Sequence, residues 1–68
     1  MILSEMHQGE EAVLLALPPL RLPRLLSSGE RIAMVFKGRD LAVVEVGGTG
    51  LALSGELADR IIVVRAPT

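Results

Sequence analysis

One stretch in the second half of the chain constrains the fold more than any other, because it alternates like a β-strand and then meets a cluster of glycines. Its two faces are occupied in alternation, by Leu41, Val43 and Glu45 on one side and by Ala42, Val44 and Val46 on the other. Residues 47–50 read Gly-Gly-Thr-Gly, and the apolar run 51–53 follows. This pattern predicts two short strands joined by a sharp bend or a hairpin.

The spacing changes directly after this pair of strands. Residues 54–60 switch from a period of two to a helix-like spacing, which places Leu57, Ala58 and Ile61 on one side. The β-branched run 61–64 then predicts a final strand. We therefore expect a strand, a turn, a strand, a helical plug and a last strand in this order.

The first half of the chain predicts two more strands. Residues 10–17 become continuously apolar and end at Pro18 and Pro19, which favours a strand over a helix. Residues 31–37 alternate, so we expect Ile32, Met34 and Phe36 to face the core. Residues 37–40 predict a hairpin turn with Gly38 free to adopt a positive φ.

Two short helical segments are also expected. Ser4 can cap a single turn near the N-terminus. Pro23 suits the first position of a helix, so residues 23–27 predict a short helix that packs Leu22, Leu25 and Leu26 inward.

These elements predict one domain over residues 1–68, mainly β, in the form of a small SH3-like barrel of about five strands with one or two short helices. Half of the residues are hydrophobic, but Phe36 is the only aromatic one and cysteine is absent. A narrow barrel filled with branched aliphatic side chains fits this composition.

Charge and hydropathy argue against several function classes. Seven Lys and Arg residues balance eight Asp and Glu residues, and the two signs are interspersed, so a nucleic-acid partner is not expected. No segment approaches the roughly 18 consecutive apolar residues of a membrane span, and no signal peptide is recognisable. We expect a cytoplasmic protein.

The residues offer little for catalysis. His7 is the only histidine, and Ser27, Ser28 and Ser54 have no base nearby in sequence, so turn and cap roles are expected for them. Residues 47–50 lack the lysine of a phosphate-binding loop. We expect no enzyme activity, no cofactor and no built metal site. A weak ferrous-metal carrier or sensor that uses the following residues stays open as an alternative: Glu5, His7, Glu10 and Glu11.

The chain resembles the ferrous iron transport protein A (FeoA) family. Residues 3–6 (Leu-Ser-Glu-Met) with Gly9 are similar to the opening turn of that family, and residues 20–26 resemble its Arg- and Leu-rich helix. The most similar part is residues 46–53 (Val-Gly-Gly-Thr-Gly-Leu-Ala-Leu), followed by residues 56–63. The resemblance implies an SH3-like accessory protein whose partner is the cytosolic GTPase part of the membrane ferrous iron transporter. A generic SH3-like interaction module is the other alternative.

Arginines beside apolar anchors are typical of protein interfaces, so we expect the partner-binding residues to lie in the Pro-rich segment 18–28. The residues expected to bind are Leu20, Arg21, Leu22, Pro23, Arg24 and Leu25. Self-association through a sheet edge within residues 12–22, which carry few charges, stays open.

Overall fold

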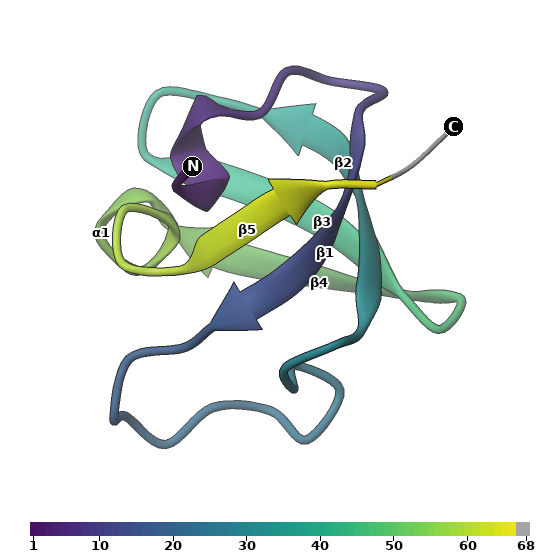
Figure 1. The fold of residues 1–68 in the computed structure, drawn as a ribbon. Coiled ribbons are helices and arrows are strands. Elements are labelled where there is room, and N and C mark those ends of the chain that lie inside the picture. The colour runs from purple at the N-terminus through teal and green to yellow at the C-terminus, as the bar shows by residue number, and fades with distance from the viewer. Residues whose placement is uncertain (67–68) are drawn as a thin grey trace.

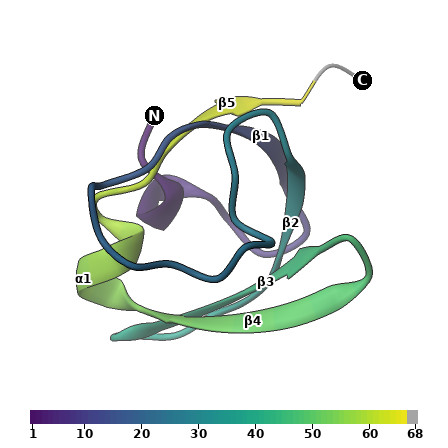
Figure 2. The ribbon, with the colours of Figure 1, turned by 90° about the horizontal axis from the view of Figure 1, so that it is seen from below.

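The computed structural model describes residues 1–66, which form a five-stranded antiparallel sheet curled into a small barrel (Figures 1 and 2). The strands are β1 (Glu11–Ala16), β2 (Arg31–Lys37), β3 (Leu41–Val46), β4 (Thr49–Ser54) and β5 (Ile62–Arg65), in the spatial order β4-β3-β2-β1-β5. A 3-10 turn, η1 (Leu3–Glu5), precedes β1, and a short helix, α1 (Gly55–Ala58), lies between β4 and β5. The mainly β, SH3-like fold predicted from the sequence is confirmed.

The β3–β4 hairpin forms as the alternation predicts. Gly47 and Gly48 make its turn with φ values of 57° and 82°, which is the left-handed conformation that a type I′ turn needs at both positions. The pairing then runs without a shift from Val46–Thr49 to Leu41–Ser54. Because type I′ turns match the twist of the flanking strands, this glycine pair aligns a complete two-stranded ribbon.

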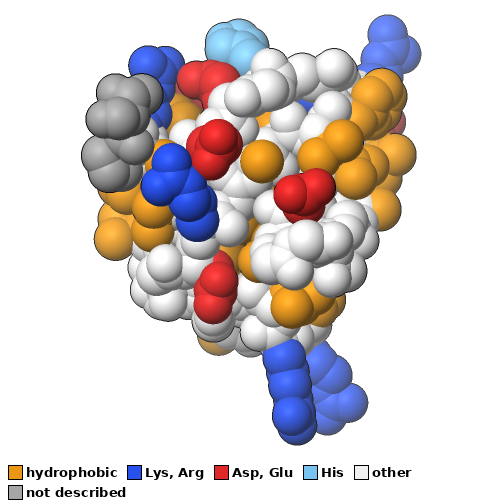
Figure 3. All heavy atoms as spheres, turned by 90° about the vertical axis from the view of Figure 1, so that its right-hand side faces the viewer, with side chains coloured by type: hydrophobic (Ala, Val, Ile, Leu, Met, Phe, Trp, Pro, Cys, Tyr) orange, Lys and Arg blue, Asp and Glu red, His pale blue; other side chains and the backbone are white. Residues whose placement is uncertain are grey.

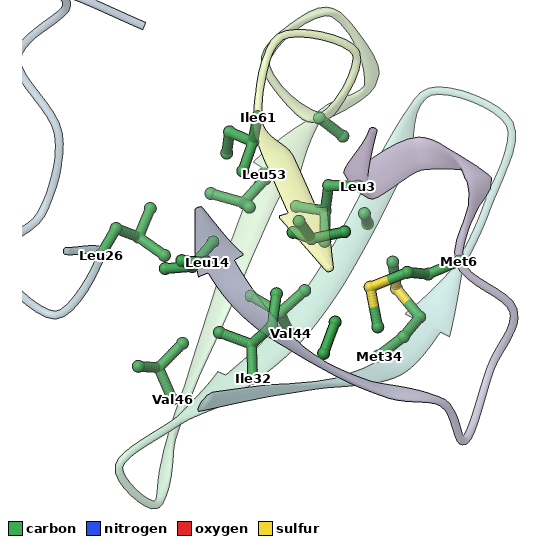
Figure 4. Close-up of a cluster of buried hydrophobic side chains, with 14 residues drawn as sticks. Leu3, Met6, Leu14, Leu26, Ile32, Met34, Val44, Val46, Leu53 and Ile61 are labelled. Atoms are coloured by element: carbon green, nitrogen blue, oxygen red, sulfur yellow. The ribbon is translucent and has the colours of Figure 1, made fainter. Parts of the chain in front are cut away.

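The core is entirely aliphatic and is drawn in Figure 4. No polar or charged side chain among residues 1–66 is buried. Met6 and Met34 lie side by side at one end of the core, while Leu26 reaches Leu14 from a separate segment at the other end (Figure 4). The buried side chains are Leu3, Met6, Ala12, Leu14, Leu26, Ile32, Met34, Ala42, Val44, Val46, Leu53, Ala58, Ile61 and Val63.

The expectation that Phe36 faces the core is wrong. Ile32 and Met34 are buried, but the pairing of β2 with β3 shifts between Met34 and Phe36, so the alternation slips and Phe36 is 47% exposed. Its ring lies against Gly38, where a Cβ atom would be 3.1 Å from the ring. Gly38 does not take a positive φ, so the ring, and not the turn conformation, is what favours glycine there.

The helix expected over residues 23–27 is absent from the structure. The β1–β2 connection (residues 17–30) contains only turns, of which one is closed by the Leu26 N–H donating to the Pro23 carbonyl at 3.0 Å. Leu26 is buried and Leu22 partly so, but Leu25 is exposed. A five-residue segment is too short to be stable as a helix by itself, so the burial of Leu26 against the core decides its conformation.

The N-terminal segment covers the outer edge of β5. The Leu3 N–H donates to the Ile61 carbonyl and the Val63 N–H to the Met1 carbonyl, both at 2.8 Å. Ser4 lies inside η1 and does not cap it; instead the Glu5 carboxylate accepts from the Ile2 N–H at 2.9 Å. The expected turn is present, but with a different cap.

Candidate functional site

A shallow groove of about 300 Å³ lies between the β1–β2 connection and α1. It is lined by Leu20, Arg21, Leu22, Ser54, Glu56, Leu57 and Arg60, and we call these residues the α1 groove. Two segments that are more than thirty residues apart in sequence therefore form one concave surface.

The wall formed by α1 is held by its own capping. The Ser54 hydroxyl accepts from the Leu57 N–H at 3.2 Å, as expected of an N-cap, and the Arg60 N–H donates to the Leu57 carbonyl at 2.9 Å. Ala58 and Ile61 point into the core. Because the inner side of this turn is anchored, its outer residues Glu56 and Arg60 are held at the surface.

The opposite wall is held by the core and by the ends of the connection. Leu26 is buried, the Ser28 hydroxyl donates to the Leu15 carbonyl at 3.0 Å, and the Gly29 N–H donates to the Leu14 carbonyl at 2.7 Å. At the other end, the Leu20 N–H closes a tight turn on the Pro18 carbonyl at 2.8 Å. These contacts hold residues 20–22 beside α1 although the segment has no regular structure.

The α1 groove combines apolar side chains with two arginines, Arg21 and Arg60, and one carboxylate, that of Glu56. Leu20 is 50% exposed, and Leu22 and Leu57 are partly buried. Arg21 and Arg60 are exposed, and neither forms an ion pair with another residue of the described chain, whereas Arg31 pairs with Glu11 at 2.9 Å. Unpaired guanidinium groups around an apolar floor are suited to binding a protein surface that presents carboxylates.

The residues expected to bind a partner divide into two groups. Leu20, Arg21 and Leu22 line the α1 groove, while Pro23, Arg24 and Leu25 are exposed beyond it and do not. The residues that sequence reasoning missed are Glu56, Leu57 and Arg60. Their helix-like spacing is visible in the sequence, but by itself it predicts only a helical plug for the barrel.

The three acidic residues near His7 accept hydrogen bonds from three different groups, and only Glu10 bonds to His7, through its backbone N–H. The Glu10 carboxylate accepts from the His7 backbone N–H at 2.6 Å, the Glu11 carboxylate accepts from Arg31, and the Glu5 carboxylate accepts from Ile2. The bond from the His7 N–H holds the pKa of Glu10 below its usual range, with a smaller contribution from Arg65. Each of these carboxylates thus has a local structural partner.

No group of three or more His, Asp or Glu side chains within residues 1–66 is arranged to hold a metal ion. A second groove, of about 170 Å³, lies on another side of α1 and is lined in part by Asp40, Glu56 and Asp59 together with Lys37 and Arg39. The mixture of charges there does not make a cation site.

Charged side chains of both signs are interspersed with apolar ones on the face shown in Figure 3. Lys and Arg side chains project at the bottom of this view, at the end of the molecule where the β1–β2 connection lies in Figure 1. In the part of the chain that the structure describes, no helix is long and apolar enough to cross a bilayer.

The strand order and the position of α1 place the chain among small SH3-like β-barrels with a helical turn between the last two strands. Within that class, the crystal structure of an iron uptake regulatory protein, FeoA, superimposes on it with a TM-score of 0.80 at 23% sequence identity, covering 97% of each chain. The chain therefore has the FeoA fold over nearly its whole length. No family model matches the sequence, and no curated protein is significantly similar to it.

Proposed function

We propose that this chain is a cytoplasmic accessory protein of ferrous iron uptake that binds the cytosolic GTPase part of the membrane ferrous iron transporter. The observation that carries the proposal is the agreement of the whole fold with an iron uptake regulatory protein, end to end on both chains. The chain acts by binding and not by catalysis, and binding changes the state of the GTPase or of the pore.

The α1 groove is the proposed contact surface. It provides exposed leucine for burial and two free guanidinium groups for orientation, which is the combination found at the centres of protein interfaces. Its walls are anchored from the core side, so little conformational entropy is lost when a partner binds. The metal carrier alternative has less support, because the carboxylates of Glu5, Glu10 and Glu11 each accept a hydrogen bond from a backbone N–H or from Arg31.

The test is a titration of the isotopically labelled chain with the isolated GTPase region of the transporter from the same organism, followed by NMR. We expect shifts in residues 20–22 and 56–60. Arg60→Glu should weaken binding roughly tenfold, because it reverses a charge at the groove. Arg24→Glu is the matched control, since Arg24 is an exposed arginine of the β1–β2 connection outside the groove.

Two results would contradict the proposal. The absence of any shift at high micromolar partner would refute direct binding to the GTPase region. Equal weakening by Arg24→Glu and Arg60→Glu would show that binding exists but does not use the α1 groove.

A further inference from the structure

The two edges of the sheet differ in how they are covered. The edge at β5 is closed by the N-terminal segment, through the Leu3 to Ile61 and Val63 to Met1 hydrogen bonds. The edge at β4 has no strand beyond it in the described chain, as the sheet order and Figure 2 show. Within residues 1–66, β4 is thus the edge at which the sheet can be extended.

The register shows which backbone groups of β4 are free. The two-residue turn closes on the Val46–Thr49 pair, so in the alternating antiparallel pattern Thr49, Leu51 and Leu53 hydrogen-bond to β3. Gly50 and Ala52 then direct their N–H and carbonyl groups away from β3. No other element of the described chain donates to or accepts from these two residues.

This edge carries none of the features that usually prevent strands from pairing. Residues 49–54 include no charge and no proline, and the β3–β4 ladder has no bulge. The residues on the same face of the strand as this free edge are Gly50, Ala52 and Ser54, all small and exposed. The residues of this edge therefore present no bulky or charged side chain to an approaching strand.

We infer that two copies of this chain associate through their β4 edges, antiparallel and about a two-fold axis at Ala52. In this arrangement Ala52 lies opposite Ala52 of the other copy, and Gly50 lies opposite Ser54 of the other copy. In each copy, Phe36 pairs with Val43 and Val43 pairs with Ala52, which gives an apolar row across three strands. In the dimer this row continues into the same three residues of the second copy.

The proposed pairing brings no like charges together, and it stops at two copies. Glu45 pairs with Gly50 in each copy, and Leu41 pairs with Ser54. Because Gly50 lies opposite Ser54 of the second copy, Glu45 is aligned with Leu41 of that copy, and the two Glu45 carboxylates do not oppose each other. Because the second edge of each copy is covered at β5, the association ends at a dimer and does not continue into a fibre. This surface shares Ser54 with the α1 groove, but the inference rests on the free edge of β4 and does not depend on the proposed function.

The experiment compares the mass of the chain by sedimentation equilibrium, from micromolar to millimolar concentration, with that of Ala52→Pro. Proline removes the N–H that points away from β3 and leaves the β3–β4 ladder in place. The variant should therefore fold, but the dissociation constant of its dimer should rise at least about tenfold. Ala52→Thr keeps the N–H and is the matched control; it should still form dimers. If Ala52→Pro does not fold, Ala52→Lys serves in its place, because the lysines of the two copies would lie opposite each other and repel.

Hydrogen exchange gives an independent measure on the unaltered chain. The amides of Gly50 and Ala52 should become protected as concentration rises, whereas that of Leu51, already bonded to β3, should not change. A chain that stays monomeric at millimolar concentration overturns the inference. A dimer that persists unchanged in both the proline and the lysine variant, or protection that rises elsewhere but not at Gly50 and Ala52, also overturns it.

Discussion

Replacing Leu26 with alanine tests how the β1–β2 connection is held. Leu26 is 4% exposed although it belongs to a segment without regular structure, and it fills the end of the barrel beside Leu14 (Figure 4). Its neighbour Leu25 is 38% exposed. The two leucines are adjacent in sequence and identical in chemistry, so they form a matched pair.

The expected loss in the free energy of unfolding follows from the burial of the Leu26 side chain. Removing three buried carbons at about 0.8 kcal/mol each loses about 2.4 kcal/mol of transfer free energy. A cavity would add to this, but a flexible connection can settle into the space, so we expect the lower end of the range for Leu→Ala, about 2–3 kcal/mol. For a domain of this size that corresponds to a fall in Tm of roughly 10–20 °C. Leu25→Ala should cost less than about 1 kcal/mol.

Urea unfolding followed by far-UV circular dichroism measures both variants, since the chain has no tryptophan or tyrosine for fluorescence. The reasoning is refuted if the two variants lose equal stability, which is the result that an amphipathic helix over residues 23–27 would give. It is also refuted if Leu26→Ala costs less than Leu25→Ala.

Three further predictions concern the turn, the cap and the acid range. Gly48→Ala should cost about 1 kcal/mol because alanine is strained at a φ of 82°, and Gly50→Ala, at an ordinary φ with open space around it, should cost less by urea denaturation. Ser54→Ala should cost about 0.5–1 kcal/mol by removing the N-cap of α1, and a threonine there should restore most of the loss in the same assay. The lowered pKa of Glu10 means that its bond to His7 contributes stability at neutral pH, which is lost as the pH falls from the usual carboxyl pKa through the lowered one. Stability should therefore decline less steeply with acid in Glu10→Gln than in the unaltered chain, and an identical pH profile for the two would contradict this.

The strands could be predicted because alternation and glycine placement are local signals. Residues 41–46 and the Gly47–Gly48 pair specify a hairpin without any information from the rest of the chain. The outward position of Phe36 could not be predicted, because a bulge shifts the alternation by one residue and leaves no mark in the sequence. The prediction of a helix over residues 23–27 was wrong, because the burial of Leu26, a tertiary contact, decides the conformation of that segment.

Half of the α1 groove was accessible to sequence reasoning. Arginine beside leucine at residues 20–22 is a recognisable interface composition. The other half depends on contact between that segment and Leu57 and Arg60, far away in sequence, and this proximity exists only once the barrel has closed.

The contact between the N-terminal segment and β5 also has a consequence for the order of folding. The Met1 amino group donates to the Val63 carbonyl across a sequence separation of 62, whereas β2, β3 and β4 are joined by short turns. Local hairpins pay a small loop-closure entropy and form early, and a contact that spans the chain forms late. During synthesis, the β2–β4 meander can therefore assemble before β5 emerges from the ribosome, and β5 then pairs with β1 and the N-terminal segment to complete the barrel.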